Sequence, residues 1–214
     1  MTPTLDILNH WNITQTVNPA DDGGLINDTF IVGEPPTAVL QRVNPIFAPS
    51  VHHDIEVITE HLAKRGVQTP KLVRTTKGEL CVPTEAGTWR VLSYLPGITV
   101  HRVTSPSQAA SAAALVGRFH SATEDLDHRF HFVRPGAHDT VAHMQSLRTA
   151  LDTASGDPLE KEACAIGREV LHRWEGWSGT LDLPMRISHG DLKISNLRFS
   201  SDGDTATGIL DLDT

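Results

Sequence analysis

The sequence predicts an α+β protein in two parts, a strand-rich first half followed by a mainly helical second half. Before residue 96, β-branched and aromatic residues gather in short runs, which is typical of strands. After it, apolar residues recur every three or four positions, as on one face of a helix. Pro96-Gly97 interrupts the chain between these patterns. We therefore expect an N-terminal part at 1–95 and a C-terminal part at 96–214.

We expect five strands in the first half, with one helix inserted after the third strand. The runs that predict strands are 14–18, 29–32, 38–43, 72–74 and 89–95. Asp21-Asp22-Gly23-Gly24 lies between the first two runs and predicts a hairpin turn, because glycine tolerates positive φ. The helix is predicted by four apolar residues at intervals of four, three and four, with a possible stop at Gly66: Val51, Ile55, Ile58 and Leu62.

Three helices are expected in the second half. The first is the alanine-rich run 111–121, and the second carries its apolar residues at 141, 144, 147 and 151. The third begins at Asp157-Pro158, where Glu160 would complete a capping box. Its expected apolar stripe consists of Ala163, Ile166, Val170, Trp174 and Trp177.

Composition excludes several classes of protein. A net charge of -8 argues against broad nucleic-acid binding, which needs clustered Lys and Arg. No apolar run approaches the roughly 20 residues of a membrane-spanning helix. The N-terminus has neither a basic flank nor an apolar signal core, so we expect a cytoplasmic protein without a membrane partner.

The chain has 12 histidines, which raises the question of a metal site. The pairs that stand close in the sequence are His52-His53 and His128 with His131. Neither pair has a cysteine or carboxylate at the spacing of structural zinc sites. The sequence therefore predicts that these are surface or core histidines.

The most informative segment is ISHGDLKISNLRF at 187–199, which contains Asp191, Lys193 and Asn196. Fifteen residues after Asn196 comes Asp211, at the centre of the run ILDLD. Phosphoryl transfer to a hydroxyl needs a carboxylate base, hard oxygen ligands for Mg²⁺ and a cation that offsets negative charge. Asp191 would be the base, Lys193 the cation, and Asn196 and Asp211 the metal ligands.

Each part of this pattern has a plainer interpretation when taken alone. A His-Gly-Asp triplet also occurs in metal phosphoesterases, and Asp-Leu-Asp at a strand end can be a simple turn. The order and spacing of the whole set make it far more specific than its parts. The role of Asp213 stays open between support of the metal ligands and turn formation.

HGDLKISN followed by ILDLD resembles the catalytic and metal-binding segments of the aminoglycoside phosphotransferase-like kinases. The runs GGLINDTFIV and VLQRVNPIF are most similar to the N-acetylhexosamine 1-kinase group within that superfamily. The resemblance implies the two-lobed protein-kinase-like fold, with an antiparallel N-terminal sheet and one helix. It also implies ATP and Mg²⁺ as cofactors and a small-molecule hydroxyl as acceptor. Members of this family continue beyond the position of Thr214, so the C-terminal lobe is expected to be incomplete.

The resemblance assigns further residues to the nucleotide. The hairpin with Gly23, Gly24 and Asn27 would cover the phosphates, although it has no GxGxxG pattern. Arg42 stands where kinases present a lysine. Its acidic partner is expected on the following helix, with Glu56 as the first choice and Asp54 or Glu60 as alternatives. Ser93-Tyr94-Leu95 resembles the hinge that meets the adenine.

The acceptor is expected to be a sugar or amino sugar, on the similarity to hexosamine kinases alone. An aminoglycoside, a choline-like alcohol and homoserine stay open within the same chemistry. A nucleotide-binding pseudokinase or regulatory module is the alternative from another class. A protein kinase is disfavoured, because Asp211-Leu212-Asp213-Thr214 lacks the Asp-Phe-Gly signature.

Overall fold

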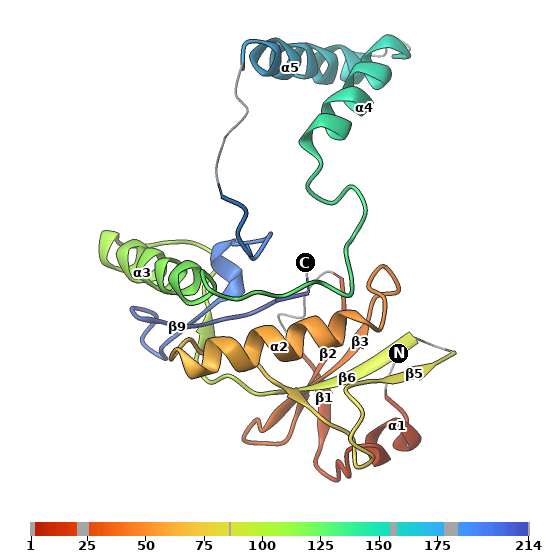
Figure 1. The fold of residues 1–214 in the computed structure, drawn as a ribbon, viewed down its shortest axis with the longest axis vertical. Coiled ribbons are helices and arrows are strands. Elements are labelled where there is room, and N and C mark those ends of the chain that lie inside the picture. The colour runs from red at the N-terminus through yellow and green to blue at the C-terminus, as the bar shows by residue number, and fades with distance from the viewer. Residues whose placement is uncertain (1–2, 21–25, 86, 155–157, 178–183, 214) are drawn as a thin grey trace. The chain divides into compact units, whose positions relative to one another are not determined.

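The computed structural model describes residues 3–20, 26–85, 87–154, 158–177 and 184–213, without the side chains of 158–160. These residues form two compact units (Figure 1). One unit comprises Met1–Arg134 and Arg186–Thr214, and the other comprises Pro135–Met185. The architecture is α+β, as the sequence predicts, and the candidate catalytic residues all belong to the first unit. The boundary expected between residues 95 and 96 would separate the two lobes of a kinase-like fold, which is a different division from these two units. It stays a prediction.

Among the described residues, six strands form the antiparallel sheet of the first unit. The spatial order is β1-β2-β3-β6-β4, and β5 pairs with β6. Register places Asp28 of β2 opposite Arg42 of β3. The strands are β1 (Val17–Pro19), β2 (Asp28–Val32), β3 (Ala38–Val43), β4 (Leu72–Val73), β5 (Val82–Thr84) and β6 (Gly87–Ser93).

Two helices cover opposite faces of this sheet. The short helix α1 (Leu5–Asn9) packs Ile7 against Leu40, Trp89 and other apolar residues of one face. Helix α2 (Val51–Lys64) packs Val51 and Ile55 in a cluster with Val43 on the other face (Figure 1). Both faces are therefore buried, and β6 is buried at the three successive positions 89–91. Arg90 points away from the α1 face because side chains alternate along a strand.

The second core lies between helix α3 (Pro106–Ala122), the end of α2 and a small antiparallel sheet. Within the described residues, that sheet has the order β7-β8-β9. Leu115, Phe119 and Phe199 are almost fully buried in this core. The strands are β7 (Ile98–Thr99), β8 (Leu197–Phe199) and β9 (Ala206–Ile209), and a 3-10 turn at Ile194–Asn196 leads into β8. This sheet therefore positions both the candidate catalytic segment 187–199 and the segment that carries Asp211.

The unit Pro135–Met185 contains helices α4 (Thr140–Asp152) and α5 (Pro158–Glu175). A Cβ at Gly167 would lie 3.2 Å from side-chain atoms of Leu147 and Leu151, so the helices pack closely there. Leu171 is also buried, whereas Ile166 is 60% and Val170 40% exposed. The expected stripe on α5 was thus wrong at these two positions and also at Ala163 and Trp177, which are exposed as well, because α5 contacts α4 through Gly167.

The elements that the sequence patterns did not predict are short. They are α1, β5, β7 and β8, each with too few residues to show a periodicity of its own. The expected strand at ILDLD ends earlier, since β9 stops at Ile209 and the two aspartates follow in a loop. None of the described helices is both long and apolar enough to cross a membrane.

Gly97, in the expected break after β6, has φ +116 and a Cβ there would lie 2.0 Å from the backbone oxygen of Phe199. We predict that Gly97→Ala lowers the free energy of unfolding by at least about 2 kcal/mol, from backbone strain and the clash. Gly117→Ala in α3 is the matched control, because a Cβ at that position would have no atom within 4 Å. Alanine should raise the free energy of unfolding there by about 0.5–1 kcal/mol, since it favours a helix more than glycine does. Urea unfolding of both variants tests this; equal stabilities would contradict it.

Candidate active site

The catalytic segment is held by the buried side chain of His189. Its Nε2 donates to the Leu210 carbonyl at 2.7 Å, and its Nδ1 accepts from the Asp191 amide at 3.3 Å. A carbonyl only accepts and an amide N–H only donates, so the imidazole must be neutral with its proton on Nε2. Burial lowers the pKa of His189, in agreement with a neutral ring. Gly190 has φ +82, which glycine tolerates, and turns the chain toward Asp191.

Four side chains that the sequence singles out lie together. Asn196 Nδ2 is 3.2 Å from Asp191 Oδ2 and 3.3 Å from Asp211 Oδ2, so it stands between the two carboxylates. It also donates to the Asp191 carbonyl at 2.8 Å. Lys193 Nζ forms an ion pair with Asp191 Oδ2. The carboxylate and amide oxygens of this group are the hard donors that Mg²⁺ prefers.

Asp211 is held in a strained backbone conformation with φ +64, which few residues other than glycine adopt. The preceding residue fixes it, because the Leu210 amide donates to the Asn196 carbonyl at 2.8 Å. Burial, together with the hydrogen bond and the negative charge of Asp213, raises the pKa of Asp211 to about 7. Because the ionised form of this carboxylate is disfavoured by its surroundings, a bound cation would stabilise it.

Asp213 forms a buried ion pair that the sequence patterns did not reveal. Arg90 Nη2 of β6 donates to Asp213 Oδ2 at 2.7 Å, and the two side chains are only 4% and 1% exposed. Burial alone would raise the pKa of Asp213, but the charge and hydrogen bond of Arg90, together with a hydrogen bond from Asp211, lower this pKa. Arg90 Nε also donates to Gln41 Oε1 of β3 at 2.9 Å. Asp213 thus joins the loop after β9 to the first sheet.

Arg42 pairs within its own sheet. Its Nε donates to Asp28 Oδ2 at 2.8 Å, from the neighbouring position on β2. Both side chains line a pocket of about 220 Å³, together with Ile26, Val43, Asn44 and Pro45. Asn27 is buried beside this pocket, where its Oδ1 accepts from the Asn44 amide and its Nδ2 approaches Asp213 Oδ2 at 3.4 Å.

The expected pair of Arg42 with an acid of α2 is replaced by other contacts. Glu56 accepts from Arg74 Nη2 through both oxygens, at 2.6 and 2.7 Å. Asp54 accepts a hydrogen bond from the His131 amide in the segment after α3, and Glu60 is exposed. The register of β2 and β3 already gives Arg42 a carboxylate from Asp28, so it does not depend on the helix for its counter-charge.

The expected hinge, Ser93-Tyr94-Leu95, runs from the end of β6 toward β7. Ser93 Oγ accepts from the Lys71 amide at 2.9 Å, and the Leu95 carbonyl accepts from Arg198 Nε at 3.1 Å. The Arg198 guanidinium also lies 5.8 Å from the centre of the Tyr94 ring. Arg198 of β8 therefore fixes the connection between the two sheets.

The remaining expected residues, Gly23 and Gly24, lie outside the described residues. Sequence reasoning missed Arg90 and Arg198, which hold the candidate site together. A signal existed for Arg90, since a charged residue inside the otherwise apolar run TWRVL needs a buried partner. No local signal pointed to Arg198.

Comparison with known proteins identifies the family. The model of the phosphotransferase enzyme family matches residues 18–214, so the chain belongs to this family. A homoserine kinase of Methylobacterium sp. (strain 4-46) is 31% identical over 159 residues, which are 72% of this chain and 45% of that protein. A homoserine kinase of Parvibaculum lavamentivorans is 27% identical over 160 residues, with the same coverage. The chain thus spans about half the length of these curated relatives.

Solved structures show that the fold is that of protein-kinase-like phosphotransferases, as predicted. A GDP complex of aminoglycoside 2'-phosphotransferase-IIIa superposes with a TM-score of 0.68 at 14% identity, covering 96% of this chain and 70% of that one. An amicoumacin kinase bound to AMP-PNP and Ca²⁺ gives 0.60 at 16% identity, covering 94% and 59%. These likenesses show the fold alone. The narrower resemblance to hexosamine kinases stays a prediction.

The first unit should be less stable when one partner of the buried ion pair is truncated. We predict that Asp213→Ala lowers the free energy of unfolding by about 3–5 kcal/mol, because the buried Arg90 charge loses its counter-charge. Asp204→Ala, at an exposed position in the turn between β8 and β9, should change it by less than about 0.5 kcal/mol. Denaturant unfolding measures both, and equal effects of the two variants would refute the structural role of the pair.

Replacement of both partners by apolar residues separates pairing from packing. The double variant Arg90→Met with Asp213→Leu should lose less free energy of unfolding than the two single variants lose together. The reason is that no buried charge is left without a partner in the double variant.

Proposed function

We propose that this chain carries the catalytic core of a kinase that transfers the γ-phosphoryl group of Mg·ATP to a hydroxyl of a small molecule. The observation that carries the proposal is the position of Asn196, whose amide lies within 3.3 Å of both Asp191 and Asp211. This grouping supplies a base and two oxygen ligands for a metal within one small volume. Membership of the phosphotransferase enzyme family supports the same chemistry.

Asp191 is suited to the role of base. The hydrogen bond from Lys193 lowers the pKa of Asp191, which keeps the carboxylate ionised at neutral pH. It is also 36% exposed, so a hydroxyl can reach it. As the acceptor oxygen forms its bond to the γ-phosphorus, the bond from that phosphorus to the β–γ bridging oxygen breaks. The hydroxyl proton passes to Asp191, and ADP leaves with the electron pair of the broken bond.

Asn196 and Asp211 would hold Mg²⁺, and their donor chemistry fits this ion. When bound, Mg²⁺ neutralises charge on the nucleotide phosphates. Lys193 would offset charge on the transferring group, and Arg42 would reach the phosphates from the pocket that it lines with Asp28. Ser93, Tyr94 and Leu95 would meet the adenine, and the hairpin with Gly23, Gly24 and Asn27 would cover the phosphates. Asp213 would support Asp211 without binding the metal, because Arg90 already engages it.

Two acceptor classes have separate support. A sugar or amino sugar is favoured by the likeness of the N-terminal runs to hexosamine kinases. Homoserine is favoured by relatives that are homoserine kinases, at 31% and 27% identity. Parallel assays with hexosamines and with homoserine, followed by measurement of ADP release, decide between them.

The metal assignment predicts the behaviour of Asp211→Ala. We expect Mg·ATP affinity to fall at least about tenfold, since even residues that only orient metal ligands contribute 10–100-fold. Isothermal titration calorimetry with and without Mg²⁺ measures this. Asp204→Ala serves as the control, because it removes an exposed carboxylate from the turn between β8 and β9. Unchanged affinity in Asp211→Ala would show that the metal binds elsewhere.

The base assignment predicts that Asp191→Asn turns over about 10²–10⁴-fold more slowly than the wild type. The amide keeps the shape of the side chain but cannot take the proton, so nucleotide binding should change much less than turnover. Coupled measurement of ADP release with each acceptor tests this. Equal, slow release by wild type and variant in all acceptors would favour a pseudokinase without turnover.

A further inference from the structure

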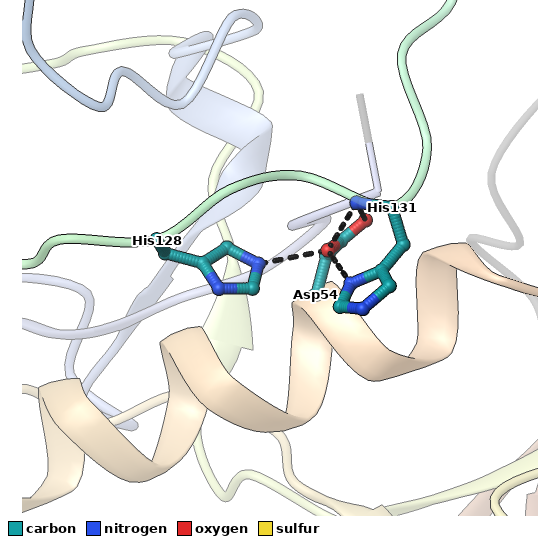
Figure 2. Close-up of side chains that lie close together, drawn as sticks. All are labelled: Asp54, His128 and His131. Carbon is teal, nitrogen blue, oxygen red and sulfur yellow. Dashed lines mark hydrogen bonds and ion pairs between the residues drawn. The ribbon is translucent and has the colours of Figure 1, made fainter.

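A carboxylate and two imidazoles converge where the segment after α3 crosses helix α2. Asp54 projects from α2, and His128 and His131 come from the segment that follows α3 (Figure 2). His128 Nε2 lies 2.8 Å and His131 Nδ1 lies 2.9 Å from the same oxygen, Asp54 Oδ1. The sequence predicts only surface or core histidines here, because neither histidine has a carboxylate at zinc-site spacing along the chain. Asp54 is 74 residues away from His128 in the chain.

The distances suit a zinc ion. One ligand atom from each residue lies within 4.8 Å of the others. Nitrogen and oxygen ligands bind Zn²⁺ at about 2.0–2.1 Å, so tetrahedral neighbours stand about 3.3 Å apart. The two contacts of Asp54 Oδ1 would therefore lengthen by only a few tenths of an ångström. Two histidines and one carboxylate, with a fourth position open, form one of the known ligand sets of zinc.

The carboxylate is oriented by the backbone around it. Asp54 Oδ2 accepts from the Phe132 amide at 3.0 Å, and the His131 amide donates to both oxygens, at 2.9 Å to Oδ1 and 3.2 Å to Oδ2. These bonds fix the orientation of the carboxylate beside the imidazoles, as hydrogen bonds to ligating carboxylates do in metal sites. Phe132 also packs against Phe47, with ring centres 6.1 Å apart. The segment is therefore in place before any ion binds.

Exposure differs among the three side chains in a way that permits entry of an ion. The Asp54 side chain is 4% and the His128 side chain 9% exposed, whereas that of His131 is 54% exposed. A buried anion next to an accessible imidazole favours a cation that approaches from solvent.

We propose that Asp54, His128 and His131 form a zinc-binding site that fastens residues 123–134 to helix α2. The site is separate from Asn196 and Asp211, uses nitrogen ligands that Mg²⁺ does not favour, and does not depend on the proposed phosphoryl transfer. The competing interpretation is that the hydrogen bonds to Asp54 alone hold the segment.

The test is zinc titration of the metal-free 214-residue chain by calorimetry, with His131→Gln as the main variant. His131 is the most exposed of the three ligands, so its replacement should leave the fold intact. We expect wild type to bind one Zn²⁺ at this site and His131→Gln to bind it at least about tenfold more weakly. His143→Gln removes an exposed histidine from α4 and should bind as wild type does. This control is needed because the chain has 12 histidines.

Two further measurements decide the outcome if a variant is unstable. The visible absorption of bound Co²⁺ should be lost in His128→Asn and kept in Asp211→Asn, which separates the site from the carboxylates near Asn196. Zn²⁺ should slow hydrogen exchange of the His131 and Phe132 amides in the wild type. Equal zinc affinity in wild type and His131→Gln, or no zinc binding by the folded wild type, would overturn the proposal. The hydrogen bonds to Asp54 and the packing of Phe132 would then hold the segment without a metal.

Discussion

The buried ion pair between Arg90 and Asp213 is the contact on which the candidate site depends. Arg90 lies in β6, which is bonded to β3, β4 and β5. Its guanidinium would be costly to bury without a counter-charge. Asp213 supplies that charge from the loop after β9, so this loop must lie against the first sheet. Asp211 stands two residues before Asp213, and its position is therefore set by the pairing of a neighbour that takes no part in the proposed chemistry.

A second set of contacts fixes the catalytic segment to the same loop. Both backbone groups of Leu210 are used, because its amide donates to Asn196 and its carbonyl accepts from His189. Asp191 and Asp211 come from different segments, yet Asp211 directly follows Leu210 and Asp191 lies two residues after His189. Small errors in the placement of reacting groups are expensive in catalysis. The strained φ of Asp211 is maintained by contacts on both sides of it, from Leu210 and from Asp213.

Local patterns in the sequence were enough to predict the main elements and the central residues. The three strands before α2, the long helices and the grouping of Asp191, Asn196 and Asp211 follow from periodicity and from a compact motif. What the sequence could not predict depends on contacts between distant positions. Arg90 and Asp213 are 123 residues apart, and Asp54 and His128 are 74 apart. Such pairs are decided by the packing of sheets and helices, and a single sequence carries no direct record of it.

The choice of partners for Arg42 follows from the geometry of helix α2. Successive residues turn by about 100° around a helix, so Asp54 and Glu56 point about 200° apart and cannot face one partner. Asp54 faces the segment 123–134, and Glu56 faces Arg74.

Arg42 instead receives its counter-charge from Asp28, its neighbour across the sheet. Because Nε and Nη2 both donate to this carboxylate, the plane of the guanidinium is fixed. A planar group held in this way suits the paired hydrogen bonds that arginine makes with phosphate, whereas lysine acts as a point charge. Asp28 of β2 thus gives Arg42 the counter-charge that was expected from an acid of helix α2.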